Sequence, residues 1–117
     1  MRRKSKKPVA RRRWPPSNAA LDALIEEATI DGYGEPEQAT SFCTVLDEHV
    51  AVPFDTSLLG IAVTVERIAM TDNDRIVAVC RRGRSRQTIS LVDLPIPSPP
   101  PTGAEWIEAY RRWARWQ

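Results

Sequence analysis

The sequence predicts an α+β fold in which two N-terminal helices are followed by a small antiparallel sheet or barrel and then by a final helix. Three observations lead to this prediction. Apolar residues recur at helical spacing in residues 17–50 and again in residues 102–116. Between these segments, short alternating apolar runs are separated by tight turns, as in antiparallel sheets. A chain of 117 residues that is 42% hydrophobic can bury the core of one domain.

Residues 1–16 are predicted to form a basic, disordered arm, and residues 17–117 a single domain. The arm contains eight lysines and arginines and no acidic residue, so it cannot bury apolar surface. It lacks the apolar segment of a secretory signal and the serine-rich, amphipathic character of a transit peptide. No run of apolar residues in the chain is long enough to span a membrane. We therefore expect a cytoplasmic protein that does not insert into membranes.

The first helix is expected to begin at Ser17 or Asn18, because either side chain can cap a first helical turn. Its apolar side consists of Leu21, Leu24, Ile25 and Ala28. Gly32 and Gly34 should end this helix, and Pro36 suits the first turn of a second one. The second helix has as its core side Ala39, Phe42, Val45, Leu46 and Val50, and Pro53 should stop it.

Three strands are expected, in residues 61–66, 75–80 and 87–92, because apolar residues alternate or run continuously there. The stretch "TDND" at 71–74 joins the first two strands, and "RRGRSR" at 81–86 joins the next two through a turn centred on glycine. Such short connections predict antiparallel pairing.

Residues 94–103 are rich in proline, which predicts a stiff, extended connector to the last helix. That helix presents on one side Trp106, Ile107, Tyr110, Trp113 and Ala114. An aromatic stripe at helical spacing is typical of a core-facing surface, so we expect the helix to pack back onto the sheet.

Nothing in the sequence predicts an enzyme. The single histidine, His49, follows two acidic residues at the end of a predicted helix, where a structural role is usual. No glycine-rich phosphate motif and no nucleophile motif occurs. Cys43 and Cys80 lie in apolar patterns, and two cysteines with one histidine make no zinc site. We expect both cysteines to be small buried hydrophobic residues.

Charge is segregated along the chain. Residues 17–74 contain twelve acidic side chains and one basic side chain, Arg67. Residues 75–117 contain eight arginines and three acidic side chains. The folded part therefore begins acidic and ends basic, which points to a cation or a basic surface as partner of the first half and to an anionic partner of the second.

The acidic half concentrates its charge between the first two helices, in "DGYGEPEQ" at residues 31–38. If these helices run antiparallel, Asp31, Glu35 and Glu37 lie close together, with Glu27 one turn back. A hard cation would remove their repulsion, and calcium takes roughly six to eight oxygen ligands of mixed type. The alternative is an acidic, solvated turn in which Glu35 and Glu37 interact with the positive end of the helix dipole.

A second acidic pair, Asp47 and Glu48, lies near the end of the second helix. At helical rise it is about 15 Å from Glu37, so one ion cannot contact both groups. The sequence therefore leaves two weak sites, or one site and one acidic pair without an ion. Asp72 and Asp74 are a lesser candidate, because Asx-turn chemistry explains aspartates in a turn.

The segment "DGYGEPEQATSFCTVLDEHVAVPF", residues 31–54, resembles the opening segment of the CcbP-like calcium-binding protein family of bacteria. The matching positions are Asp31, Tyr33, Gly34, Glu37, Gln38, Leu46, Asp47, Glu48, Pro53 and Phe54. The stretches "GIAVTVERIAM", "LVDLP" and "EWIEAYRRW" resemble the strands and last helix of that family, so the likeness spans about residues 20–116.

The resemblance implies an SH3-like or Sm-like sheet, and calcium bound by acidic residues without an EF-hand. The family is acidic overall, whereas this chain has a basic arm and an arginine-rich half. The first hypothesis is thus a non-enzymatic calcium buffer or sensor. Its candidate ligands are Asp31, Glu35, Glu37, Asp47 and Glu48.

The second hypothesis is an adaptor that binds nucleic acid or an acidic protein through residues 1–13 and the 81–86 hairpin. The arginines of that hairpin are Arg81, Arg82, Arg84 and Arg86, and the last helix adds Arg111, Arg112 and Arg115. Such a cluster can bind phosphates. The same arginines could instead pair with the acidic half of the molecule or of a neighbouring copy, and copies would then associate head to tail.

Overall fold

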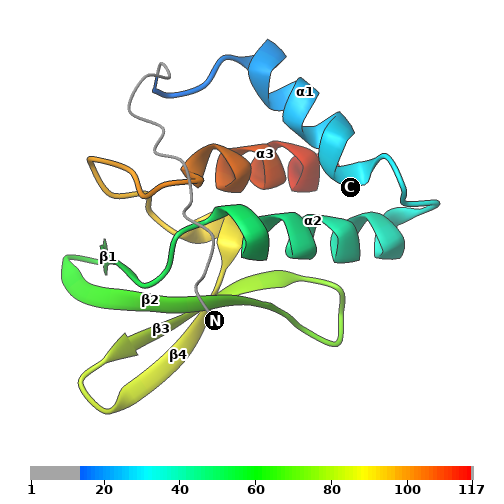
Figure 1. The fold of residues 1–117 in the computed structure, drawn as a ribbon. Helices are drawn as coiled ribbons and strands as arrows, with labels where there is room; N and C mark the ends of the chain where they lie inside the picture. Colours follow the sequence, from blue (N-terminus) through cyan, green and yellow to red (C-terminus); the bar gives the residue numbers. More distant parts are fainter. Residues whose placement is uncertain (1–13, 117) are drawn as a thin grey trace, which may run out of the picture.

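The computed structural model describes residues 14–116, so most of the predicted basic arm lies outside the described part of the chain. The elements are α1 (Asn18–Thr29), α2 (Glu35–His49), β1 (Phe54–Leu58), β2 (Ile61–Met70), β3 (Ile76–Arg82), β4 (Ser85–Ser90), the short 3-10 helix η1 (Leu91–Asp93) and α3 (Ala104–Arg115) (Figure 1). The predicted α+β fold, with two helices before a sheet and one after it, is confirmed.

The strands form one antiparallel sheet in the order β1-β2-β3-β4. β1 and β4 are its two edges, so the sheet is open and does not close into a barrel. β1 lies outside the three strands that the sequence predicts. Its central residue Thr56 is buried, and the Thr56 hydroxyl donates a hydrogen bond to the carbonyl oxygen of Pro95 at 2.8 Å. A buried threonine here hides the apolar alternation by which strands are recognised.

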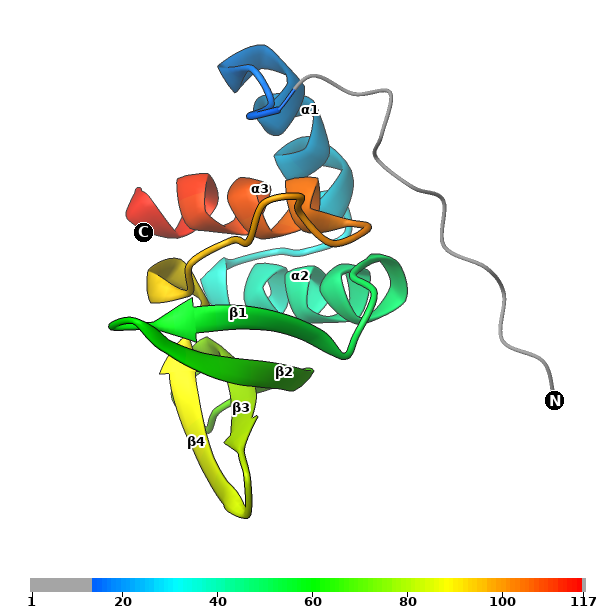
Figure 2. The same ribbon diagram turned by 90° about the vertical axis from the view of Figure 1, so that its left-hand side faces the viewer.

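The three helices lie on one side of the sheet (Figure 2). α2 contacts β2, α3 packs against α2 and η1, and α1 lies outermost against α3 and α2. The core between these layers contains the fully buried side chains Phe42, Leu46, Ile76, Leu91, Leu94 and Ile107. The sheet and all three helices thus share one hydrophobic core.

The aromatic stripe of α3 faces this core, as predicted, with Trp106, Ile107, Tyr110 and Trp113 buried. The ring of Phe42 on α2 meets Tyr110 edge to face at a centroid distance of 5.6 Å, and Trp113 at 5.4 Å. The Tyr110 hydroxyl accepts a hydrogen bond from the backbone N–H of Ile76 at 3.3 Å. The stripe therefore joins α3 both to α2 and to the sheet.

The ends of the helices follow local chemistry. Ser17 caps α1, because its hydroxyl accepts a hydrogen bond from the Ala20 N–H at 3.1 Å. α1 ends at Thr29, before the glycines that should stop it, and α2 ends at His49, before Pro53. The ring of His49 stacks on Trp106 at a centroid distance of 4.9 Å, which is consistent with a structural role for this histidine.

The two cysteines are free and differ in burial. Cys80 is buried, as predicted, whereas Cys43 is only half-buried. Burial raises the pKa of both thiols, and the charge of Asp47 raises that of Cys43 further. Both thiols are therefore expected to be protonated at neutral pH. Within residues 14–116, no helix is long and apolar enough to cross a bilayer.

Candidate metal centre

The turn between α1 and α2 is held tightly against the first turn of α2. The Gly32 N–H donates to the Thr29 carbonyl oxygen at 3.0 Å, and the Gln38 N–H donates to the Gly34 carbonyl oxygen at 2.9 Å. A Cβ at Gly32 would meet the Gln38 side chain at 2.7 Å and its backbone nitrogen at 2.9 Å. Only glycine allows this approach, which fixes Asp31 beside the start of α2.

Three carboxylates border one open hollow beside this turn. They are Asp31 from the α1–α2 turn, Glu37 from α2 and Asp74 from the β2–β3 turn. The hollow has a volume of about 370 Å³, and its remaining lining residues are Pro36, Thr40, Ser41 and Thr44. The β2–β3 turn lies below the N-terminal end of α2 (Figure 1), which brings the two turns to the same side of the molecule. We call this space the acidic hollow.

Asp74 occupies a turn that is organised by Thr71. The Thr71 hydroxyl accepts hydrogen bonds from the backbone N–H groups of Asn73 and Arg75, both at 3.3 Å. Asp74 itself adopts a left-handed backbone with φ 60°, which aspartate tolerates better than most residues. Its backbone N–H donates to the Thr71 carbonyl oxygen at 3.1 Å. The side chain that builds the turn is therefore a threonine, and Asp74 is left to border the acidic hollow.

The predicted ligands divide into separate places. Asp31 and Glu37 share the acidic hollow, and Glu35 lies exposed in the first turn of α2 without bordering it. Asp47 and Glu48 are exposed near the opposite end of α2. Asp74, which sequence reasoning treated as a lesser candidate, completes the first group. No sequence signal joins it to Asp31, because the two turns meet only in the folded chain.

The side chains that border the acidic hollow carry no polar atom other than oxygen. Its polar groups are three carboxylates and the hydroxyls of Thr40, Ser41 and Thr44. Among residues 14–116, Asp31, Glu37 and Asp74 form no ion pair, so their charges are not neutralised within this part of the chain. In the same part of the chain, no three acidic, histidine or cysteine side chains converge closely enough to hold a metal in their present rotamers.

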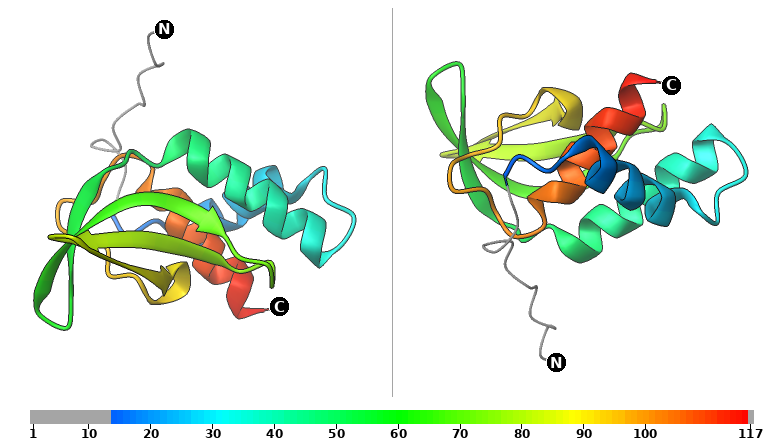
Figure 3. Two further views of the ribbon diagram at one scale, coloured as in Figure 1. Left: turned by 90° about the horizontal axis from the view of Figure 1, so that it is seen from below. Right: turned by 90° about the horizontal axis from the view of Figure 1, so that it is seen from above.

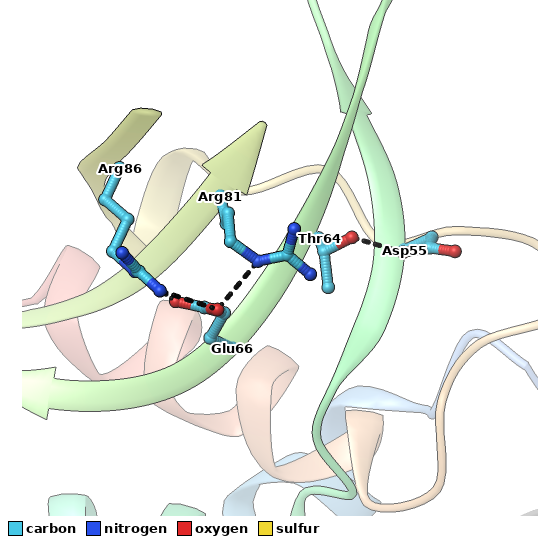
Figure 4. A network of polar contacts seen from close by, with 5 residues as sticks. All are labelled: Asp55, Thr64, Glu66, Arg81 and Arg86. Carbon is cyan, nitrogen blue, oxygen red and sulfur yellow. Dashed lines mark hydrogen bonds and ion pairs between the residues drawn. The ribbon is translucent and has the colours of Figure 1, made fainter. Parts of the chain in front are cut away.

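The arginine-rich hairpin is partly neutralised from within. β2 contains a bulge between Val65 and Arg67, and the bulged residue Glu66 accepts hydrogen bonds from the Nε atoms of Arg81 and Arg86, both at 2.8 Å (Figure 4). These bonds, from Arg86 first and then from Arg81, hold the pKa of Glu66 below its usual range. Beside this network, Thr64 donates to Asp55 at 2.8 Å and so joins β2 to β1.

Two arginines of α3 are also paired within the molecule. Arg112 donates to Asp22 of α1 at 2.7 Å, and Arg111 donates to Glu108 at 3.4 Å. Arg82 and Arg84, by contrast, are exposed and form no ion pair within residues 14–116. The acidic and basic halves therefore pair partly within one molecule, as one of the sequence alternatives proposed.

No family model matches the chain, and no curated protein matches it. One similar solved structure is described as a calcium-binding protein in the calcium-binding form. The two structures superpose with a TM-score of 0.62 over 85% of this chain and 90% of the other, at 18% sequence identity. The chain shares its fold with a calcium-binding protein. This match is consistent with the resemblance of residues 31–54 to the CcbP-like family. At 18% identity, the structural match shows a shared fold and nothing more.

Proposed function

We propose that this chain is a small, non-enzymatic, cytoplasmic calcium-binding protein that holds the ion in the acidic hollow. Asp31, Glu37 and Asp74 supply the charged ligands. The observation that carries the proposal is that three acidic residues border one open space, although they come from the α1–α2 turn, from α2 and from the β2–β3 turn. The fold likeness to a calcium-binding protein supports the same conclusion.

The helix dipole does not explain all of these acids. Glu35 and Glu37 lie in the first turn of α2, where the positive end of the dipole favours anions. Asp31 and Asp74 lie outside the helices, so neither is a first-turn residue of α2. Like charges around one space repel one another even in water. A divalent cation would turn this repulsion into attraction, which is a physical reason for Asp31 and Asp74 to border the same hollow as Glu37.

The ligand chemistry favours calcium over other divalent ions. Zinc prefers histidine and cysteine, and neither residue borders the hollow. Magnesium requires a compact octahedral site, whereas calcium accepts an irregular set of carboxylates, hydroxyls and waters. The three carboxylates are on exposed residues and can turn onto an ion at little cost. Because an open site leaves several waters on the ion, we expect a weak dissociation constant, on the order of 10⁻⁴ M.

The other predicted ligands have lesser roles in this proposal. Glu35 contributes to the negative potential at the mouth of the hollow without touching the ion. Asp47 and Glu48 lie about 15 Å from Glu37 at helical rise, so they cannot share its ion. They are expected to bind calcium more weakly or not at all, because two adjacent residues on a helix point in different directions.

Calorimetric titration of the full chain with calcium and with magnesium tests the proposal. We expect calcium to bind, and Asp31→Asn and Asp74→Asn each to weaken binding by about tenfold, the effect of losing roughly 1.4 kcal/mol. Asp47→Asn is the matched control, since it removes an exposed carboxylate of the same chain outside the hollow, and it should bind within about twofold of the unaltered chain. Loss of binding in Asp47→Asn with none in Asp74→Asn would refute the assignment.

The alternative function is an adaptor for nucleic acid or an acidic protein. It relies on residues 1–13, which lie outside the described part of the chain, and on the 81–86 hairpin. Glu66 already engages Arg81 and Arg86, which leaves Arg82 and Arg84 for a partner. This function predicts binding to double-stranded DNA that falls steeply with salt and is lost when residues 1–13 are deleted.

A further inference from the structure

A second, larger hollow lies on the sheet, away from the acidic one. It has a volume of about 690 Å³ and opens between the β1–β2 and β3–β4 hairpins. Its apolar lining consists of Leu58, Leu59, Ile61, Val63, Cys80 and Ile89, and Arg82, Gly83, Ser85 and Gln87 complete it. We call it the sheet hollow.

The sheet hollow is a continuation of the hydrophobic core into solvent. Side chains two residues apart on a strand share one face, so Ile61, Val63 and Val65 of β2 point the same way. Val65 is fully buried beneath the helices, Val63 is half-buried, and Ile61 is 43% exposed. The core-facing side of the sheet therefore extends past the helices that cover it, and the part beyond them is left without a cover.

Leu59 is a second sign that this surface has a partner. It is fully exposed at the tip of the β1–β2 hairpin, next to Gly60, and both residues have positive φ, 51° and 79°. A two-residue hairpin turn of this kind strongly favours Asn-Gly. Asparagine adopts positive φ more readily than leucine, and its side chain is well hydrated. A leucine here is unfavourable both for the backbone and for hydration, and a contact that buries it would offset this.

The edge of the sheet hollow is positively charged. Arg82 lines it, Arg84 lies next to it in the β3–β4 turn, and neither has an ion-pair partner within residues 14–116. The occupant should therefore be apolar at its centre and acidic around it. Residues 1–13 of the chain do not qualify, because they contain eight basic and no acidic side chains.

The α1–α2 turn has the complementary composition. Ile30 and Tyr33 are 72% and 91% exposed there, and the exposed acidic residues Asp31, Glu35 and Glu37 lie close to them in the sequence. This turn and the β1–β2 hairpin lie at opposite ends of the molecule in both views of Figure 3, so one copy cannot dock its own turn. We propose that the α1–α2 turn of one copy docks into the sheet hollow of a second copy, with Tyr33 against Leu59 and the acidic residues beside Arg82 and Arg84.

Such a contact is heterologous, because two different surfaces of the chain meet. It leaves one free turn and one free hollow at the ends of every assembly, so growth is open unless a ring closes. Opposite charges steer the encounter and make the association sensitive to salt. The proposal stands on the shape, exposure and charge of the two surfaces and does not depend on calcium binding.

Sedimentation velocity of the full chain over a range of concentrations, in calcium-free buffer at low and high salt, tests this contact. The turn variant combines Ile30→Ser with Tyr33→Ser, and the hollow variant combines Leu59→Asn with Arg82→Glu. The unaltered chain should associate at low salt, and each variant alone should be monomeric. Trp116→Ser is the matched control, since it removes another largely exposed aromatic residue, and this variant should associate normally.

Mixing the two variants in equal amounts is the decisive arm. Together they offer one intact hollow and one intact turn, so they should form a dimer and nothing larger. Circular dichroism should show unchanged folding, because all four altered residues are exposed. Three results would each overturn the proposal: an unaltered chain that is monomeric at every concentration and salt, a turn variant that still associates, or a mixture that stays monomeric.

Discussion

The guanidinium of Arg112 donates hydrogen bonds to both carboxylate oxygens of Asp22, at 2.7 Å and 3.4 Å. This pair joins α3 to α1, the helix whose end positions Asp31. The hydrogen bond from Arg112 holds the pKa of Asp22 below its ordinary value. A carboxyl group with a lowered pKa in the folded state stabilises the fold above its unfolded pKa of about 3.9 and ceases to do so as pH falls through the lower folded value.

We therefore expect Asp22→Asn to lower the melting temperature at neutral pH. The difference from the unaltered chain should shrink as pH falls below about 4 and vanish once Asp22 is protonated in the folded protein. Thermal unfolding followed by circular dichroism at a series of pH values measures this. Glu27→Gln on the same helix is the control, since Glu27 forms no ion pair within residues 14–116 and its replacement should leave the melting temperature unchanged. If Asp22→Asn lowered the melting temperature by the same amount at every pH, the ion pair with Arg112 would not be the cause of the stabilisation.

Gly103 and Gly83 allow a matched comparison of two glycines with positive φ. A Cβ at Gly103 would overlap the carbonyl group of His49 and the backbone of Val50, whereas a Cβ at Gly83 meets nothing within 4 Å. Gly103→Ala should thus cost more than about 4 kcal/mol of the free energy of unfolding, because backbone must move. Gly83→Ala should cost only the conformational penalty of about 1 kcal/mol. Urea unfolding measures both, and equal losses would mean that α2 does not approach Gly103 closely.

Phe42 should contribute a large part of the core stability. It is fully buried and packs against Tyr110 and Trp113, so Phe42→Ala leaves a cavity at the centre of the α2–α3 contact. We expect a loss of about 3–5 kcal/mol in the free energy of unfolding. Phe42→Leu keeps most of the volume and should lose less than about 1.5 kcal/mol. A loss below 1 kcal/mol for alanine, on the order of a surface substitution, would exclude this packing.

Calcium should weaken the head-to-tail contact if both proposals hold. An ion held by Asp31, Glu37 and Asp74 neutralises the acidic turn that faces Arg82 and Arg84 of the next copy. Sedimentation of the unaltered chain should therefore shift towards monomer when calcium replaces a chelator. Asp74→Asn separates the two proposals, because it removes a calcium ligand and leaves the docking turn intact. This variant should associate with or without calcium, and a calcium effect that persists in it would disprove the coupling.

Local patterns predicted most of the fold. The buried side of α3 could be predicted because its aromatic residues recur at helical spacing. The buried side of α2 could be predicted because Ala39, Phe42 and Leu46 also recur at helical spacing. The strand β1 could not be predicted from the sequence. The central residue of its core-facing side is Thr56, whose hydroxyl reaches the Pro95 carbonyl oxygen only in the folded chain. A polar residue that is satisfied by a distant partner looks like a surface residue in the sequence.

Only part of the candidate site could be predicted from the sequence, because its residues come from segments that are far apart in the chain. Asp31 and Glu37 are close in sequence, and the glycines between the helices predict that they meet. Asp74 reaches the hollow from the β2–β3 turn, and nothing in "TDND" indicates which helix end that turn approaches. The pairing of Glu66 with Arg81 and Arg86 depends on a bulge in β2, which no turn residue in the sequence marks. Contacts between separate turns and across strands require the tertiary structure.

The most direct measurement of the central claim is a calcium titration followed by amide chemical shifts in NMR spectra. The account predicts shifts that saturate together in two separate segments, residues 31–44 and residues 71–75, with little change near Asp47 and Glu48. Magnesium at the same concentration should produce smaller shifts. An unchanged spectrum at millimolar calcium, or changes confined to the end of α2, would contradict a calcium site between the two turns.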